Sequence, residues 1–180
     1  MRLAPVLSPA DLPSAELQAA RLDGELYGVG DCFSPIDIID GRDQRALALA
    51  TVVPHRLIVE LLSAAWVWGA ALSAPARPRL CADITARTRP PIGSAILREV
   101  VVDQADVVIL GRLRITTPLR TAVDLARLDP EPDREVIARL FDIGGFGLAD
   151  CEALIQRRRN LPDKRRALLR LESAQPPVTR

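Results

Sequence analysis

Residues 106–128 constrain the fold more than any other part of the chain. Residues 107–110 and 113–115 are short apolar runs, the first of them rich in β-branched side chains, and Gly111-Arg112 between them suits a turn. Two such runs joined by a short turn predict a β-hairpin.

A helix start follows this hairpin directly. The Thr117 side chain can accept a hydrogen bond from a free backbone N–H, and Pro118 at the first helical position removes no helical hydrogen bond. Apolar residues then recur at helical spacing and predict one buried stripe: Leu119, Ala122, Val123 and Ala126. Arg120 and Asp124 lie four residues apart on the opposite side, where an exposed ion pair contributes about 0.2–0.5 kcal/mol.

The same stretch resembles the C-terminal domain of the AbiEi-family antitoxins, which belong to bacterial type IV toxin–antitoxin systems. The resemblance rests on Gly111, Ile115-Thr116-Thr117-Pro118, Arg120-Thr121 and Asp124-Leu125-Ala126. Residues 63–69, Ser-Ala-Ala-Trp-Val-Trp-Gly, are similar to a helix of that family, and so is the arginine-rich tail over about residues 149–172. The resemblance spans roughly residues 55–172 and implies a scaffold without a catalytic motif.

Residues 1–40 form a separate unit in the expected organisation. The pattern predicts a helix over 13–22, capped at Ser14, and a hairpin over 25–36 that turns at Gly28–Gly30. A helix followed by a hairpin is typical of the last helix and wing of a winged helix-turn-helix, a domain that commonly precedes the recognised part in this family. We expect a truncated remnant packed on the rest, because a recognition helix needs two bracing helices. Within 13–43, seven acids against two arginines also disfavour contact with DNA phosphates.

Residues 41–180 are expected to form an α+β domain. Two strands, 80–84 and 97–102, join the hairpin in a small mixed sheet of about four strands flanked by helices. A Pro-rich loop covers 87–93. Helices are expected over 41–53, 54–60 and around Trp66, over 134–141 with a stop at Gly144–Gly147, and over 149–158 and 162–172 as a helical C-terminal tail.

Composition narrows the class of protein. Hydrophobic residues make up 48% of the chain, which is ample for a core, and the three cysteines lack a Cys-x-x-Cys spacing, which favours reduced thiols in the cytoplasm. The N-terminus has no signal-peptide pattern, and no apolar run is long enough to span a bilayer. Trp66 and Trp68 cannot share one helix face, so we expect one of them in the core and the other partly exposed.

The spacing of the candidate motif residues disfavours three classes of enzyme. A nucleotidyltransferase needs Gly-Ser and then Asp-x-Asp/Glu, and Gly93-Ser94 with Asp103 comes close, but Ala105 stands at the second ligand position. A restriction-type nuclease needs an acid two residues before a lysine, and Pro162 stands there before Lys164. The glycines at 144–147 lack the Gly-Lys-Ser/Thr of a phosphate loop. We therefore expect no catalytic residue, no metal site and no cofactor.

Charge supplies the remaining functional signal. The formal net charge is +1, but residues 1–86 carry 7 basic and 10 acidic side chains, whereas residues 87–180 carry 17 and 13. Candidate nucleic-acid-binding residues are Arg157, Arg158, Arg159, Lys164, Arg165, Arg166 and Arg170, which Arg112, Arg114 and Arg120 extend if they share one side. Solvation and favourable interaction with a helix C-terminus are the more common explanation of such a cluster.

The expected function is that of a cytoplasmic AbiEi-like antitoxin or transcriptional regulator, of actinobacterial type, that acts without catalysis. Its expected partners are DNA or RNA, bound weakly through phosphates, or a cognate toxin or other protein. The alternative is a scaffold or adaptor protein, derived from that family, that does not bind DNA.

Overall fold

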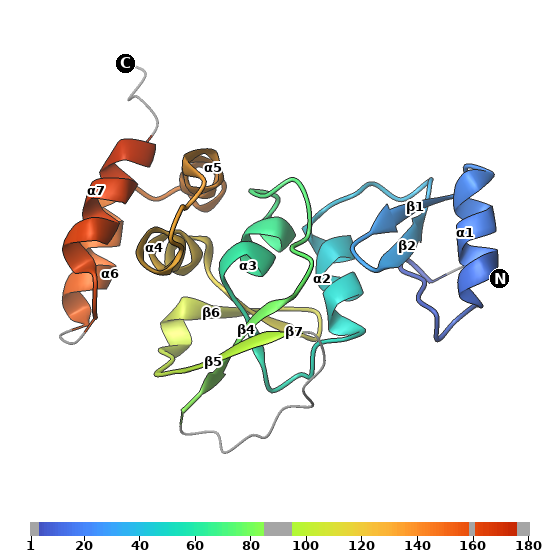
Figure 1. Cartoon of the computed structure of the whole chain (residues 1–180), viewed down its shortest axis with the longest axis horizontal. Helices are drawn as coiled ribbons and strands as arrows, with labels where there is room; N and C mark the ends of the chain where they lie inside the picture. Colours follow the sequence, from blue (N-terminus) through green and yellow to red (C-terminus); the bar gives the residue numbers. More distant parts are fainter. Residues whose placement is uncertain (1–3, 85–94, 159–160, 176–180) are drawn as a thin grey trace.

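The computed structural model describes residues 4–84, 95–158 and 161–175 (Figure 1). These residues form seven α-helices, a two-stranded sheet and a five-stranded mixed sheet, which confirms the α+β class. The predicted Pro-rich loop at 87–93, with Gly93-Ser94, lies outside the described residues.

The N-terminal helix and hairpin are present as predicted. Helix α1 (Ser14–Leu22) is followed by strands β1 (Leu26–Val29) and β2 (Cys32–Pro35), which pair antiparallel. The predicted cap is wrong by one residue, because Pro13 occupies the N-cap position and Ser14 begins the helix. Helix α1 packs on β1, and helix α2 (Arg42–Ala50) contacts both strands of the hairpin. Helix α2 ends three residues before the predicted end at Val53.

The main sheet has the strand order β5-β4-β3-β7-β6. Its strands are β3 (Ile58–Val59), β4 (Arg79–Asp83), β5 (Ile96–Val100), β6 (Val107–Leu110) and β7 (Leu113–Thr116). Strand β3 runs antiparallel to β4 and parallel to β7, β4 runs parallel to β5, and β6 and β7 form the predicted hairpin.

Strand β3 contradicts the helix predicted for 54–60. Leu57, Ile58 and Val59 are at most 2% exposed, so both faces of this segment are buried, and a short apolar run of that kind does not distinguish a central strand from a buried helix. Helix α3 (Leu61–Trp68) begins directly afterwards. Within it Trp66 is buried and Trp68 is partly exposed, which confirms the expected division between the two tryptophans.

Helix α4 (Pro118–Leu128) is the centre of the C-terminal half, because it packs against α3, α5 (Arg134–Gly144), α6 (Leu148–Arg157) and α7 (Lys164–Ala174). The predicted start is confirmed: Thr117 is the N-cap, and its Oγ1 accepts a hydrogen bond from the Arg120 backbone N–H at 3.2 Å. Side chains on all sides of the helix, Arg120 to Arg127, are buried.

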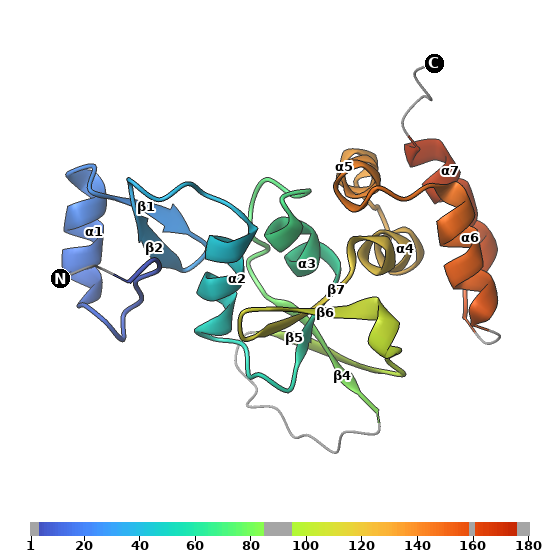
Figure 2. The same ribbon diagram turned by 180° about the vertical axis from the view of Figure 1, so that it is seen from behind.

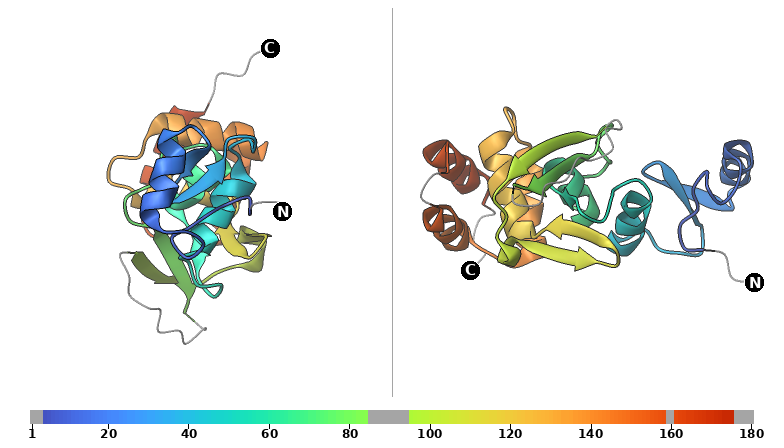
Figure 3. Two further views of the ribbon diagram at one scale, coloured as in Figure 1. Left: turned by 90° about the vertical axis from the view of Figure 1, so that its right-hand side faces the viewer. Right: turned by 90° about the horizontal axis from the view of Figure 1, so that it is seen from below.

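One hydrophobic core joins the sheet to these helices. Val59 pairs with Leu80 and Ile115 in neighbouring strands, and all three belong to the same core cluster as residues of α3 to α7. Helices α3 and α4 lie on one face of the sheet, and the view from below shows the strands in front of them (Figure 3). A second, smaller cluster fills the space under α1.

The elements follow one another along the long axis of the molecule. Helix α1 and its hairpin lie at one end, the main sheet lies in the middle, and helices α6 and α7 lie side by side at the other end (Figures 1 and 2). The glycines at 144–147 end helix α5, as predicted, with Gly145 at φ 61° in the left-handed conformation. Of the helices in the described ranges, none has the length and apolar character that crossing a bilayer requires.

Candidate anion-binding site

Asp124, on α4, is the centre of a buried cluster of charged side chains. Its Oδ2 accepts hydrogen bonds from Arg120 Nε at 2.7 Å and Arg98 Nη2 at 3.3 Å, and its Oδ1 accepts one from Arg127 Nη2 at 3.1 Å. The side chains of Arg120, Asp124 and Arg127 are at most 5% exposed. The pairing of Arg120 with Asp124 is therefore confirmed, but the expected exposed position is wrong, because helices surround α4.

Two further carboxylates complete what we call the buried arginine network. Glu60 Oε1 accepts from Arg98 Nε at 3.1 Å and Oε2 from Arg98 Nη2 at 2.5 Å, a two-pronged contact that suits a guanidinium. Asp106 Oδ2 accepts from Arg120 Nη1 at 2.7 Å and also from Arg158 Nη2. The network thus connects α3, β5, α4, the start of β6 and the end of α6.

The network contains more positive than negative side chains. Four arginines, Arg98, Arg120, Arg127 and Arg158, face three carboxylates, those of Glu60, Asp106 and Asp124. The side chains of Arg98 and Arg158 are 29% and 21% exposed, so the excess positive charge reaches solvent, where a further anion can approach it.

The pKa shifts differ between two members of the network. Burial disfavours the charge of Arg98, but the hydrogen bonds and negative charges of Glu60 and Asp124 outweigh burial and raise its pKa above the usual value. Burial lowers the pKa of Arg158; the Asp103 carboxylate opposes that shift, and the positive charge of Arg98 adds to it. An anion beside Arg158 would stabilise its charged form.

A pocket of about 920 Å³ opens beside the network, and we call it the arginine pocket. Its walls come from β5 and the following segment, from α4, from the end of α6, and from Leu161 and Pro162 before α7. The lining residues are Arg98, Glu99, Val100, Val101, Val102, Asp103, Gln104, Asp106, Arg120, Arg127, Leu128, Arg157, Arg158, Leu161 and Pro162. A pocket of this volume lies in the range of about 300–1,000 Å³ that is usual for small-molecule sites.

Three of the candidate basic residues meet at this pocket. Arg120 and Arg158 belong to the network, and Arg157 is exposed at its rim and makes no ion pair within the described part of the chain. Arg159 lies outside the described residues. Helix α6 ends at Arg157, so the predicted position at a helix C-terminus is confirmed for Arg157 and Arg158.

Two other candidates lie elsewhere. Arg112 is exposed at the turn between β6 and β7, at the end of the hairpin away from Asp106, and Arg114 Nη1 donates to the Arg56 carbonyl at 3.5 Å. A four-residue strand separates that turn from the network, about 13 Å at the usual rise. Arg112 and Arg114 therefore do not extend the patch of the C-terminal tail.

The candidates of α7 divide into bound and exposed side chains. Arg170 donates to the carbonyls of Ala126, Asp129 and Pro130, and so holds α7 on the C-terminal end of α4. Arg166 pairs with Asp163 at 3.2 Å and donates to the Arg127 carbonyl. Lys164 is partly exposed and makes a polar or electrostatic interaction, so it is not a free cation.

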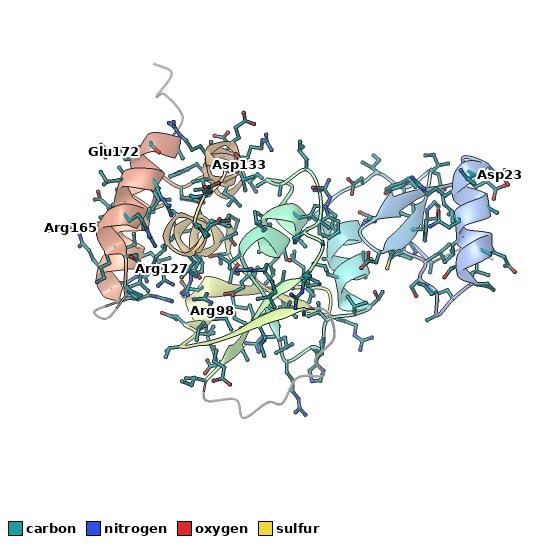
Figure 4. All side chains as sticks on the ribbon, in the orientation of Figure 1. Asp23, Arg98, Arg127, Asp133, Arg165 and Glu172 are labelled. Carbon is teal, nitrogen blue, oxygen red and sulfur yellow. The ribbon has the colours of Figure 1, made fainter. Side chains whose placement is uncertain are left out.

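Arg165 differs from these residues. It is exposed and, among the described side chains, has no ion-pair partner. Figure 4 shows Arg165 on the outer side of the α6–α7 pair, whereas Arg98 and Arg127 lie further in, toward the sheet.

Arg98 and Arg127 did not figure among the candidates from the sequence. Arg127 is three residues after Asp124 and seven after Arg120, a helical spacing that signals one shared side of α4. Arg98 has no comparable signal, because its partners Glu60 and Asp124 are 38 and 26 residues away.

The carboxylates considered for a nucleotidyltransferase have other roles here. Asp103 accepts from the Ala105 backbone N–H at 3.0 Å and caps a short 3-10 helix, Gln104–Asp106, and Asp106 pairs with two arginines. In the described ranges no group of three or more His, Cys, Asp or Glu side chains is arranged to hold a metal ion. The three cysteines are free thiols, all buried.

Comparisons with known proteins give likenesses to solved structures alone. No protein-family model matches the chain, and no curated protein matches it. Among solved structures the chain is similar to the crystal structure of the RV2827C protein from Mycobacterium tuberculosis, with a TM-score of 0.49 and 19% identity over 95% of this chain and 72% of that chain. A likeness of this size carries no argument about family or function.

Proposed function

We propose that the chain is a non-catalytic binding protein of the AbiEi antitoxin type, a regulator whose C-terminal helices contact the phosphates of nucleic acid. The observation that carries this proposal is the pair Arg157 and Arg165. Both are exposed, both lie within one helical turn of the α6–α7 connection, and neither makes an ion pair with a described residue. Arg157 lies at the rim of the arginine pocket and Arg165 on the outer side of α7, and two such cations near one connection suit an anionic surface.

Phosphate contacts of this kind give affinity without sequence preference. They release counterions and carry no base information, so the binding is salt-dependent and weak. The described N-terminal part, residues 4–40, has one helix and one hairpin, and its exposed turn at Gly30-Asp31 carries no cation. Base contacts are therefore not part of the proposal.

A second function, that of a scaffold or adaptor that binds a protein such as a cognate toxin, is favoured by a different observation. Arg120, Arg158 and Arg170, three of the candidates for nucleic acid, bind carboxylates or carbonyls of the protein itself. Internal contacts of this kind stabilise the fold and leave fewer cations for phosphates.

Charge reversal separates the two functions. Replacing Arg157→Glu and Arg165→Glu together should weaken binding of a labelled DNA duplex, measured by fluorescence anisotropy at low salt. The matched control, Arg21→Glu with Arg42→Glu, makes the same change in net charge at two exposed positions of the acidic N-terminal part and should leave binding nearly unchanged. Equal losses in the two variants, or no duplex binding by the wild-type chain, would favour the adaptor.

A further inference from the structure

Contact with a nucleic-acid backbone requires only cations on the surface, but the arginine pocket is also a concave site. Arg165 on the outer side of α7 offers a cation on the surface, whereas Arg98, Arg120 and Arg127 line a pocket of about 920 Å³, in which Arg120 and Arg127 are buried. A partly open pocket with cations at its wall suits a small ligand, which can lie within it.

Arg127 gives the most specific indication of a ligand. It is 3% exposed and lines the pocket, and its Nε has no hydrogen-bond partner although the atom is buried. Tyr27 is the other residue with such an atom in the described part of the chain, and it lies in the N-terminal hairpin. A buried donor without a hydrogen-bond partner destabilises the folded state, so a ligand acceptor that reached this N–H would stabilise the protein.

Neighbouring side chains can hold the same acceptor. A guanidinium has five N–H donors, and among the described residues Arg158 directs one of them toward Asp106. Arg157 adds a guanidinium at the rim that makes no ion pair with a described residue. Arg127, Arg157 and Arg158 thus line one pocket from two elements, the end of α4 and the end of α6.

The pocket wall also carries acidic, polar and apolar side chains. Glu99, Asp103 and Asp106 are acidic and Gln104 is polar, and the rest of the wall is apolar. Val100, Val102, Leu128, Leu161 and Pro162 line it beside the arginines. An inorganic anion would leave this wall in contact with water, whereas a flat organic ring placed against it removes apolar surface from water. The ligand that fits both parts has an anionic group and an uncharged ring system.

We infer that the arginine pocket binds a small organic phosphate of the nucleotide class, with the phosphate on Arg127, Arg157 and Arg158 and the ring on the apolar wall. A phosphate has three free oxygens, which several guanidiniums can share, and arginine matches that geometry well. This site goes beyond the proposed contact with nucleic acid, with which it shares Arg157, and it links α4, β5 and the end of α6 through one ligand.

Calorimetric titration of the full chain tests the inference. The probes are the four ribonucleoside monophosphates, the corresponding uncharged nucleosides and inorganic phosphate. We expect at least one monophosphate to bind, its nucleoside not to bind, and inorganic phosphate to bind about tenfold or more weakly, which corresponds to about 1.4 kcal/mol.

Two variants locate the bound phosphate. Arg157→Gln removes a rim donor that has no structural partner, and it should raise the Kd of the monophosphate about tenfold, as expected for the loss of a hydrogen bond to a charged group. Arg165→Gln makes the same change on the outer side of α7 and should not change the Kd. Arg127→Lys retains the charge but removes the Nε donor, and it should also weaken binding in a variant whose thermal unfolding shows that it is folded.

Three results would overturn the inference. They are an absence of binding by all four monophosphates, equal binding of nucleoside and monophosphate, and equal weakening by Arg157→Gln and Arg165→Gln. Anisotropy with the labelled duplex on the same two variants measures the proposed nucleic-acid contact separately. Loss of duplex binding in Arg165→Gln with unchanged nucleotide binding would support both sites independently.

Discussion

Replacing Asp124 with asparagine should destabilise the protein strongly. The carboxylate is 1% exposed and accepts hydrogen bonds from Arg98, Arg120 and Arg127. Asparagine has nearly the same size but no charge, so the three guanidiniums would remain buried with less compensation. Removing one partner of a buried ion pair typically costs about 3–5 kcal/mol.

A surface pair with the same spacing provides the control. Arg139 and Glu135 are also four residues apart, at 2.8 Å, but their side chains are 36% and 79% exposed. Exposed helical pairs of this kind contribute about 0.3–0.5 kcal/mol. Glu135→Gln should therefore reduce the free energy of unfolding about tenfold less than Asp124→Asn, because Asp124 is buried and has three arginine partners whereas Glu135 is exposed and pairs with one.

Urea denaturation followed by circular dichroism measures both variants. The midpoint should fall without a change in the slope m, because neither substitution alters the surface exposed on unfolding. In a thermal melt Asp124→Asn should lower Tm by about 6–20 °C, at about 2–4 °C per kcal/mol for a chain of this size. A loss below about 1 kcal/mol for Asp124→Asn, or equal losses in the two variants, would show that water reaches the network and would refute the argument.

Three further predictions concern α4, α5 and α6. Leu125→Ala should lower the free energy of unfolding by about 2–5 kcal/mol in urea denaturation, because the side chain is 2% exposed. Loss of the Thr117 cap in Thr117→Ala should lower it by about 1 kcal/mol. The reverse order would contradict the packing of α4. Gly144→Ala should cost about 1–3 kcal/mol in the same assay, since its Cβ would lie 2.5 Å from the Phe146 ring, and an unchanged midpoint would contradict this. Burial raises the pKa of Cys151 to about 12, so the native state holds this proton to higher pH than the unfolded chain. The free energy of unfolding should therefore fall as the pH rises above about 8.5, and it should fall less steeply in Cys151→Ala. Equal slopes in the two proteins would count against this cause.

Local signals in the sequence predict the hairpin and the start of α4. Gly111 stands at φ 59° in the turn between β6 and β7, a conformation that favours glycine, and Thr117-Pro118 begins the helix. Both features depend on residues that are neighbours in sequence. The outcome for β3 shows the limit of such signals, because Ile58 and Val59 form a strand only through partners in β4 and β7 that are far away in sequence.

The site depends on contacts of the same long-range kind. The amphipathic pattern of α4 correctly places Ala122 and Val123 in the core, but it also implies a solvated opposite side, which is true only of a helix packed on one face. Neighbours on every side of α4 convert the expected surface pair of Arg120 and Asp124 into the interior of the network. Charge counting along the tail finds Arg157 and Arg165 but does not separate them from Arg170, which binds backbone carbonyls.

The salt dependence of duplex binding tests the central claim most directly. Anisotropy titrations of the wild-type chain between about 50 and 200 mM salt should give a linear fall of log K with log salt, at a slope near −0.9 for each phosphate contacted. In the Arg157→Glu/Arg165→Glu variant that slope should be shallower by about 1.8, because two contacts are lost. Tight, sequence-specific binding with the same slope in both proteins would contradict the account.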